Sequence, residues 1–163
     1  MKLYHFSEHK YNVGDIIPPQ KGNSISYEIA KDIQKRTIEC FDNYIVKHYP
    51  NYVLRKKAMF AFDDVKYAHM YGVQSHRKGA IYEIEMNVSY RGPFTLVNGL
   101  LSLLDYQDKV DGVLQEYFCP KADWKVFEYI GEEFIVTNVI TDRIPYIYDF
   151  QIDHDLFDKL FVE

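Results

Sequence analysis

LYHFS at residues 3–7, MFAFD at residues 59–63 and GEEFIV at residues 131–136 are the three segments on which the predicted fold depends. Each is typical of a strand or strand edge that carries a polar group among apolar neighbours. No one of the three is specific alone. Their order and wide spacing indicate that distant parts of the chain build one site.

Composition limits the protein class. The 163 residues predict a single domain over 1–163 with a core of ordinary size. The net charge of −5 argues against holding nucleic acid by bulk electrostatics, although local basic patches remain at residues 55–57 and 77–78. Cys40 and Cys119 fit no metal or disulfide pattern. With no long apolar stretch or signal-peptide pattern, we expect a cytoplasmic protein that does not contact membranes.

Hydrophobic periodicity outlines the elements. It predicts strands over residues 2–7, 58–62, 80–86 and 133–139, and helices over residues 27–47, 65–71, 110–118 and 156–162. Residues 124–129 are expected to be extended, and residues 144–152 to form a last strand around Pro145. Gly72 is expected to end a helix, and Gly131 to introduce a strand. Strands and helices in mixed order favour an α+β fold.

The three segments together resemble the ADP-ribosyltransferase superfamily, particularly its small bacterial and phage members. The start of the chain is similar to rifampin ADP-ribosyltransferase and to a related uncharacterised bacterial family, which also has a long helix and an arginine like Arg55. The resemblance implies split mixed or antiparallel sheets around an NAD cleft, with flanking helices. It also implies transfer of ADP-ribose from NAD to an acceptor, with release of nicotinamide.

The resemblance assigns the first segment to NAD. His5 would bond the ribose of NAD, and backbone groups at Phe6 would hold the flat carboxamide, flanked by Tyr4. A strand edge supplies paired backbone donors and acceptors without side-chain entropy. Ser7 would support His5 or the carboxamide. The plainer alternative is a histidine that caps the hydrogen bonds of its strand.

The middle segment departs from the family pattern. Relatives usually carry a tyrosine that sandwiches the nicotinamide, where this strand offers Phe60 and Phe62. We expect Phe60 to supply one aromatic face and Tyr71 a second, since a cationic ring is attracted to such faces. Both rings could equally be core residues. Arg55 would clamp the pyrophosphate of NAD, or else lie in a solvated basic run.

Glu133 is the main predicted catalytic residue, and His5 is the second. Cleavage of the nicotinamide–ribose bond develops positive charge on the ribose, and a carboxylate bonded to a ribose hydroxyl stabilises that charge. Glu132 is one alternative, because neighbouring strand residues point to opposite faces and only one of the two glutamates can face the cleft. Glu116, on a predicted helix, is the other alternative. We expect the first and third segments to form adjacent strands, with His5 and Glu133 both facing the cleft. The plainer alternative is a pair of solvated carboxylates.

Other functions of the same fold class remain open. An NAD-dependent RNA 2'-phosphotransferase would need several cleft arginines, and the chain has few after the first helix. A catalytically inactive NAD-binding or interaction module is the third alternative. The acceptor is a protein, a nucleic acid or a small molecule, and a role in toxicity or phage–host conflict would add an antitoxin or regulator as partner. The remaining histidines show no ligand spacing, so no metal is predicted; they are His9, His48, His69, His76 and His154.

Overall fold

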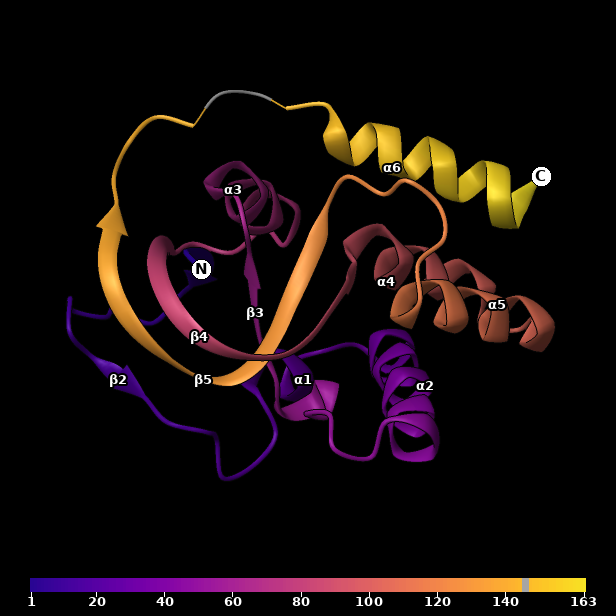
Figure 1. The fold of residues 1–163 in the computed structure, drawn as a ribbon, viewed down its shortest axis with the longest axis horizontal. Helices are drawn as coiled ribbons and strands as arrows, with labels where there is room; N and C mark the ends of the chain where they lie inside the picture. The colour runs from indigo at the N-terminus through magenta and orange to yellow at the C-terminus, as the bar shows by residue number, and fades with distance from the viewer. Residues whose placement is uncertain (145–146) are drawn as a thin grey trace.

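The computed structural model describes residues 1–144 and 147–163 and confirms an α+β chain (Figure 1). The strands are β1 (Leu3–Ser7), β2 (Ile16–Ile17), β3 (Met59–Phe62), β4 (Ala80–Pro93) and β5 (Phe127–Ile140). The helices are α1 (Ile25–Glu28), α2 (Asp32–His48), α3 (Val65–Gln74), α4 (Phe94–Leu100), α5 (Gln107–Phe118) and α6 (Asp149–Phe157). Short turns of other helix types are η1 (Arg55–Lys57), η2 (Leu101–Leu103) and η3 (Asp158–Val162).

The five strands form one antiparallel sheet that closes on itself. Their order is β2-β5-β3-β1-β4, and β4 pairs in addition with β5. Strands β1, β3, β5 and β4 therefore form a closed ring of pairings. The two long strands of the ring, β4 and β5, are strongly curved (Figure 1). The predicted split sheets are replaced by this single sheet. The prediction that the first and third segments lie on adjacent strands is wrong, because β3 lies between β1 and β5.

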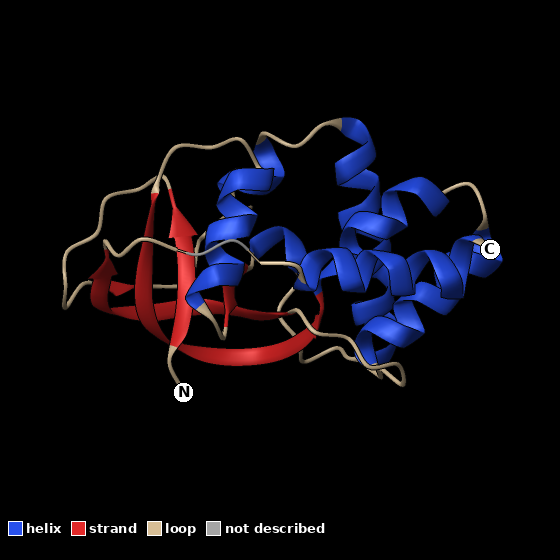
Figure 2. Cartoon of the chain, turned by 90° about the horizontal axis from the view of Figure 1, so that it is seen from above, coloured by secondary structure: helices blue, strands red, loops and turns tan. Residues whose placement is uncertain are grey.

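The core has three parts, which follow from the alternation of strand side chains. The strands gather at one end of the molecule and most of the helices at the other (Figure 2). Inside the ring lie Leu3, Met59, Ala61, Tyr82, Ile84, Tyr129, Phe134 and Val136. On the outer face, α3 covers a cluster around Phe62 and Phe94, while α2, α4, α5 and α6 contribute to a cluster around Phe41 and Tyr117.

The last predicted strand is a helix in the described part of the chain. Positions 145–146 of the predicted strand over residues 144–152 lie outside the described residues, and α6 begins at Asp149. Aromatic and β-branched residues favoured a strand there. Tertiary contacts decide otherwise: Asp153 accepts hydrogen bonds from the backbone N–H groups of Lys125 and Val126 at 2.8 and 2.9 Å. Asp153 and Phe157, one helical turn apart, are the buried residues of α6.

Strand β5 passes through Gly131 instead of starting after it. Met86 pairs with Phe134 and Val88 with Gly131, so β5 has one residue more than β4 between these pairs. This is a β-bulge at Glu132 and Glu133. A Cβ on Gly131 would lie 2.6 Å from the carbonyl oxygen of Asn87, so the glycine permits a close approach of two backbones.

Gly72 likewise has a packing role and does not end its helix, which continues to Gln74. A Cβ on Gly72 would lie 2.6 Å from Cδ2 of Phe6. The absence of a side chain therefore lets α3 press on β1. The helix predicted over residues 27–47 is also adjusted, because the chain forms the short α1 before α2 begins at Asp32.

We predict that Gly72→Ala destabilises the protein although alanine is the better helix former. Overpacking against Phe6 costs about 1–3 kcal/mol, which exceeds the propensity gain of about 1 kcal/mol. Gly112→Ala in α5 is the matched control, because its Cβ would meet only Cε1 of Phe161 at 3.7 Å. Urea denaturation should show Gly112→Ala stabilised by about 0.5–1 kcal/mol. Equal stabilisation of both variants would contradict the tight contact.

Candidate functional site

A cleft opens where β1 and β3 part. The two strands share the single register pair Tyr4↔Phe62, and beyond it they diverge. The resulting cavity of about 490 Å³ has the size of an ordinary small-molecule site. We call it the His5 cleft. It is lined from β1 and the following turn, from residues 17–24, from Ala58 and β3, and from Tyr71 and Arg77.

His5 lies at the point of divergence. Its Nδ1 is 2.6 Å from the carbonyl oxygen of Phe60, where a continued ladder would place a backbone partner. A carbonyl only accepts, so in the neutral ring Nδ1 carries the proton and Nε2 keeps a lone pair for a ligand. Burial lowers the pKa of His5, and the positive charges of Arg77 and His9 lower it further. The hydrogen bond to Phe60 raises the pKa, but its effect is smaller than that of burial. The cleft therefore holds a neutral, oriented imidazole.

Several predicted cofactor residues join His5 in the lining. Phe6, Ser7, Phe60 and Tyr71 all line the cleft. The Ser7 hydroxyl accepts a hydrogen bond from the backbone N–H of His9 at 3.1 Å, which organises the turn after β1. Phe6 and Tyr71 meet edge to face, with ring centroids 6.4 Å apart. The cleft thus combines an imidazole with aromatic walls.

Arg77 is the lining cation, and the sequence reasoning did not single it out as a site residue. It belongs to the loop between α3 and β4, and its Nη2 donates to the Tyr71 hydroxyl at 3.4 Å. Its Nε lies 3.7 Å from Oε1 of Glu8, which also lines the cleft. The preceding residue, His76, has φ of 55°, a left-handed turn that redirects the chain. The sequence signal was only the basic pair at residues 77–78.

Arg55 is not brought to the cleft. It is buried to 5% exposure and forms a two-pronged ion pair with Glu128, whose side chain is 1% exposed, at 2.5 and 3.0 Å. Burial opposes the charge of Arg55, but Glu128 raises the pKa of the guanidinium. The guanidinium carbon Cζ of Arg55 lies 4.8 Å from the ring centroid of Phe60. Arg55 therefore supports the wall of the cleft from behind, and its predicted contact with pyrophosphate gains no support.

The buried ion pair belongs to a network that joins four elements. The Tyr117 hydroxyl of α5 donates to Glu128 at 2.7 Å, and burial raises the pKa of Tyr117. Asp42 of α2 accepts from the backbone N–H groups of Arg55 and Lys56 at 2.6 and 3.3 Å. Burial raises the pKa of Asp42 against the effect of these two bonds. The network fixes the chain immediately before β3.

Two further predicted cofactor residues are packed outside the cleft. Tyr4 and Phe62 lie in the cluster beneath α3, on the face of the sheet opposite to the ring interior. Phe62 is fully buried, and its ring centroid lies 5.7 Å from that of Tyr71. Phe62 therefore supports Tyr71, and neither Phe62 nor Tyr4 lines the cavity.

Glu133 lies near the rim of the cleft but its side chain is exposed. The ring of its neighbour Phe134 lies 5.1 Å from that of His5, so Glu133 points to the other face of β5. The structure therefore does not bring the side chains of His5 and Glu133 together. Glu132, the other residue of the bulge, is half-buried.

The position of the bulge nevertheless borders the cleft. Gly131, before the bulge, pairs with Met59, and Phe134, after it, pairs with Ile17. Met59 and Ile17 both line the cleft. The backbone of residues 132–133 thus runs between two lining residues.

Glu116 has a different role from the two glutamates of the bulge. Its Oε1 accepts hydrogen bonds from Lys121 N, Ala122 N and Trp124 Nε1 at 2.8, 2.8 and 2.9 Å. This carboxylate therefore orders the connection from α5 to β5. It is not among the cleft residues.

Comparison of the chain with models of known protein families and with curated protein sequences found no match. Within residues 1–144 and 147–163, no group of three His, Cys, Asp or Glu side chains is placed to hold a metal ion. Among the described helices, none has the length and apolar character required to cross a membrane.

We predict that Glu128→Gln destabilises the protein by about 3–5 kcal/mol, because it leaves the Arg55 charge buried without its partner. Chemical denaturation measures this loss. The double variant Arg55→Met/Glu128→Leu removes both charges and should lose far less. A cost of under about 1 kcal/mol for Glu128→Gln would show that the pair does not support the fold.

We predict that His5 makes the protein less stable as pH falls below about 6.5. Burial lowers the pKa of His5 in the folded state, so the unfolded chain takes up the proton first. Neutral His5 makes its full contribution to the free energy of unfolding above the pKa of histidine in the unfolded chain. This contribution is lost as pH falls toward the pKa of His5 in the folded protein. Urea denaturation across this range should show a smaller pH dependence for His5→Gln than for the wild type. Identical slopes would contradict the assignment of a neutral His5.

Proposed function

We propose that the protein binds NAD in the His5 cleft and transfers its ADP-ribose to an acceptor. The observation that carries this proposal is the fixed imidazole of His5, held by the Phe60 carbonyl at 2.6 Å inside a cleft with an aromatic wall and an arginine. A lone pair on Nε2 suits a ribose hydroxyl, the rings suit nicotinamide, and the Arg77 guanidinium suits phosphate oxygens.

The arrangement of strands supports the same proposal. The segments LYHFS, MFAFD and GEEFIV lie on β1, β3 and β5, which are consecutive in the sheet. The ADP-ribosyltransferase resemblance likewise calls for a histidine strand, an aromatic strand and a glutamate strand around one cleft. Arg77 takes the place that the sequence reasoning gave to Arg55.

The proposed reaction breaks the bond between C1' of the ribose and the nicotinamide nitrogen. The bonding electron pair leaves with nicotinamide, and a nucleophile of the acceptor forms the new bond to C1' and releases its proton to solvent. Glu133 is proposed to stabilise the positive charge on the ribose, with Glu132 as the alternative. Neither side chain lines the cleft, so the proposal requires the carboxylate to turn toward the bound ribose. Both belong to the bulge beside Met59 and Ile17 at the cleft.

An NAD-binding module without catalysis is the second candidate. It is favoured by one observation, namely that neither glutamate of the bulge lines the cleft. The 2'-phosphotransferase alternative gains less support, because Arg77 is the lone arginine among the described residues that line the cleft.

The deciding measurement is nicotinamide release from NAD by the purified protein. We predict release by the wild type and a loss of about two orders of magnitude or more in Glu133→Gln, since the charge is removed and the shape is kept. Glu132→Gln is the matched control on the same bulge and should retain activity. Loss in Glu132→Gln alone would move the catalytic role to that residue.

Calorimetry of NAD binding serves as the control for this prediction. Glu133→Gln should bind NAD as the wild type does, because its role begins when the bond breaks. Arg77→Gln should bind about tenfold more weakly, whereas Arg36→Gln, an exposed arginine of α2, should bind normally. NAD binding without any nicotinamide release would favour the non-catalytic module, and absence of both would refute the proposed function.

A further inference from the structure

A second cavity adjoins the His5 cleft and shares Phe6 and Arg77 with it. Its volume is about 650 Å³. It is formed by the second half of α3, the loop to β4, the start of β4, the end of β5 and the residues that follow β5. We call it the α3–β4 cavity. Because Phe6 and Arg77 line both cavities, ligands in the two would be neighbours.

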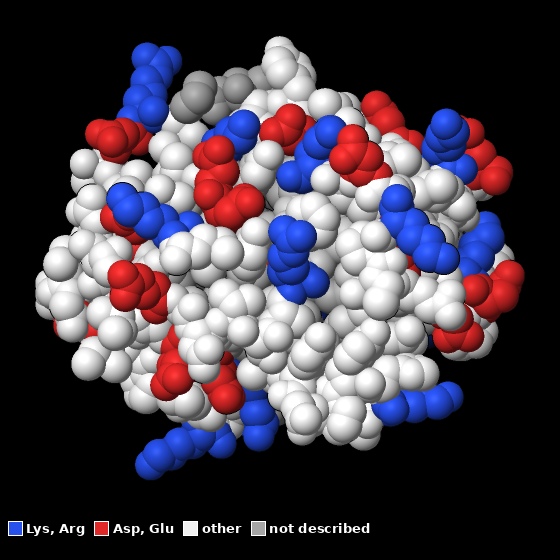
Figure 3. Space-filling view, in the orientation of Figure 1, with Lys and Arg blue, Asp and Glu red and all other residues white. Residues whose placement is uncertain are grey.

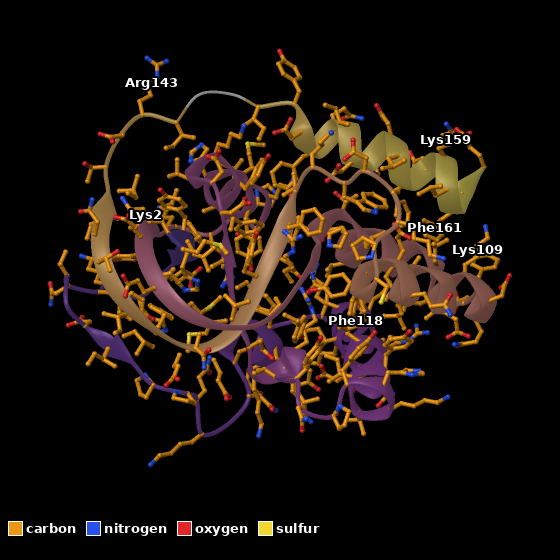
Figure 4. All side chains as sticks on the ribbon, viewed as in Figure 1. Lys2, Lys109, Phe118, Arg143, Lys159 and Phe161 are labelled. Carbon is orange, nitrogen blue, oxygen red and sulfur yellow. The ribbon has the colours of Figure 1, made fainter. Side chains whose placement is uncertain are left out.

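Positive charge gathers around the α3–β4 cavity. Arg77, Lys78 and Arg143 line it together with His69, against one carboxylate, Asp142. Within the described residues, neither Lys78 nor Arg143 has an ion-pair partner among the recorded salt bridges. Figure 4 shows Arg143 on the segment that follows β5, reaching outward at the edge of the molecule. Three basic side chains against one carboxylate leave the cavity with an excess of positive charge, which favours an anionic ligand.

This local charge is opposite in sign to the net charge of the chain. The chain has a net charge of −5, and acidic and basic side chains are interspersed on the face shown in Figure 3. Bulk attraction for polyanions is therefore weak, and selectivity for phosphate would come from the cavity itself.

The walls of the cavity are apolar behind the charged rim. Phe6, Val73, Ile81 and Ile140 contribute to the lining. An apolar wall beside cationic groups matches a planar base attached to a phosphate. The volume of about 650 Å³ accommodates one nucleotide unit.

We propose that the α3–β4 cavity binds a phosphate-bearing nucleotide, either free or as a unit of single-stranded nucleic acid, and that this nucleotide is the acceptor side of the reaction. The inference rests on the proposed function, because it places the acceptor beside the NAD cleft. The adenosine half of NAD is a poorer occupant. In the proposed NAD complex, the pyrophosphate of this half would face Arg77. Lys78 and Arg143 would then have no anionic group of NAD to contact.

The test measures binding of a fluorescein-labelled hexathymidylate to the full chain by anisotropy, over a series of salt concentrations. In Lys78→Gln/Arg143→Gln we expect at least tenfold weaker binding. The slope of log K against log salt should fall by about 1.4, since each phosphate contact in a single strand contributes about 0.7. The control is Lys109→Gln/Lys159→Gln, a half-buried and an exposed lysine at the end of the molecule opposite to Arg143 (Figure 4), which should change affinity less than twofold.

Competition experiments separate the sources of the ligand. If thymidine 5'-monophosphate displaces the oligonucleotide, a free nucleotide is sufficient for binding to the cavity. If it does not, the ligand is a nucleic-acid strand. Saturating thymidine 5'-monophosphate should leave the affinity for NAD unchanged. Competition between the two would show that the cavity is part of the NAD site, and it would overturn the proposal.

Two outcomes keep this inference distinct from the proposed function. Oligonucleotide binding that depends on Lys78 and Arg143, without NAD binding or nicotinamide release, refutes the transferase and with it the acceptor role. Nicotinamide release by a protein whose oligonucleotide binding is absent, or is equal in Lys78→Gln/Arg143→Gln and the wild type, overturns the nucleotide site alone. Mass spectrometry of the oligonucleotide after incubation with NAD should show the addition of one ADP-ribose unit.

Discussion

The buried ion pair between Arg55 and Glu128 is the interaction on which the arrangement of the cleft depends. It connects the turn before β3 to the first half of β5, and Tyr117 and Asp42 tie the same turn to α5 and α2. Two charges at 5% and 1% exposure are stable only with nearly complete hydrogen bonding. Because β3 follows directly, the position of the Phe60 carbonyl is set by this network.

The cleft then results from a local break in sheet pairing. Strand β1 is fully paired with β4 on one side, but it shares one register pair with β3 on the other. The His5 imidazole supplies the next bond across the gap, to Phe60. The sequence offered His5 as either a cap for its strand or a ligand contact. The bond from Nδ1 shows the first of these roles, and the contact of Nε2 with a ligand stays a prediction.

Much of this architecture was predictable from pattern. Alternation in β4 and the helical period of α2 gave element types correctly, and His5, Phe60 and Tyr71 were selected by their segments. Arg55 was placed wrongly because a buried arginine and a solvated one look alike in sequence. The available signal was its partner: Glu128 stands inside VFEYI at residues 126–130, where an acidic residue among apolar ones calls for a buried cation.

Other differences also have physical causes. The helix that begins at Asp149 depends on bonds from Asp153 to the start of β5, a contact between distant segments that no local window contains. The bulge at residues 132–133 interrupts the alternation between Gly131 and Phe134, and the sequence did not show that Phe134 takes the face of His5, which leaves Glu133 on the other face. Arg77 was missed because a loop residue has no periodicity, and its placement follows from the turn at His76.

Closure of the sheet also governs how copies of the chain can associate. Open sheets expose rows of backbone N–H and C=O groups that recruit strands of other molecules. Here closure gives β1 and β3 a partner strand on both sides for part of their length, and the unpaired part of β1 faces a cavity. The two-residue β2 is too short a template for stable strand addition. Beyond Ile84, however, β4 has no strand on the side of β1 in the described part of the chain, so addition of a strand from another copy would have to use this side of β4.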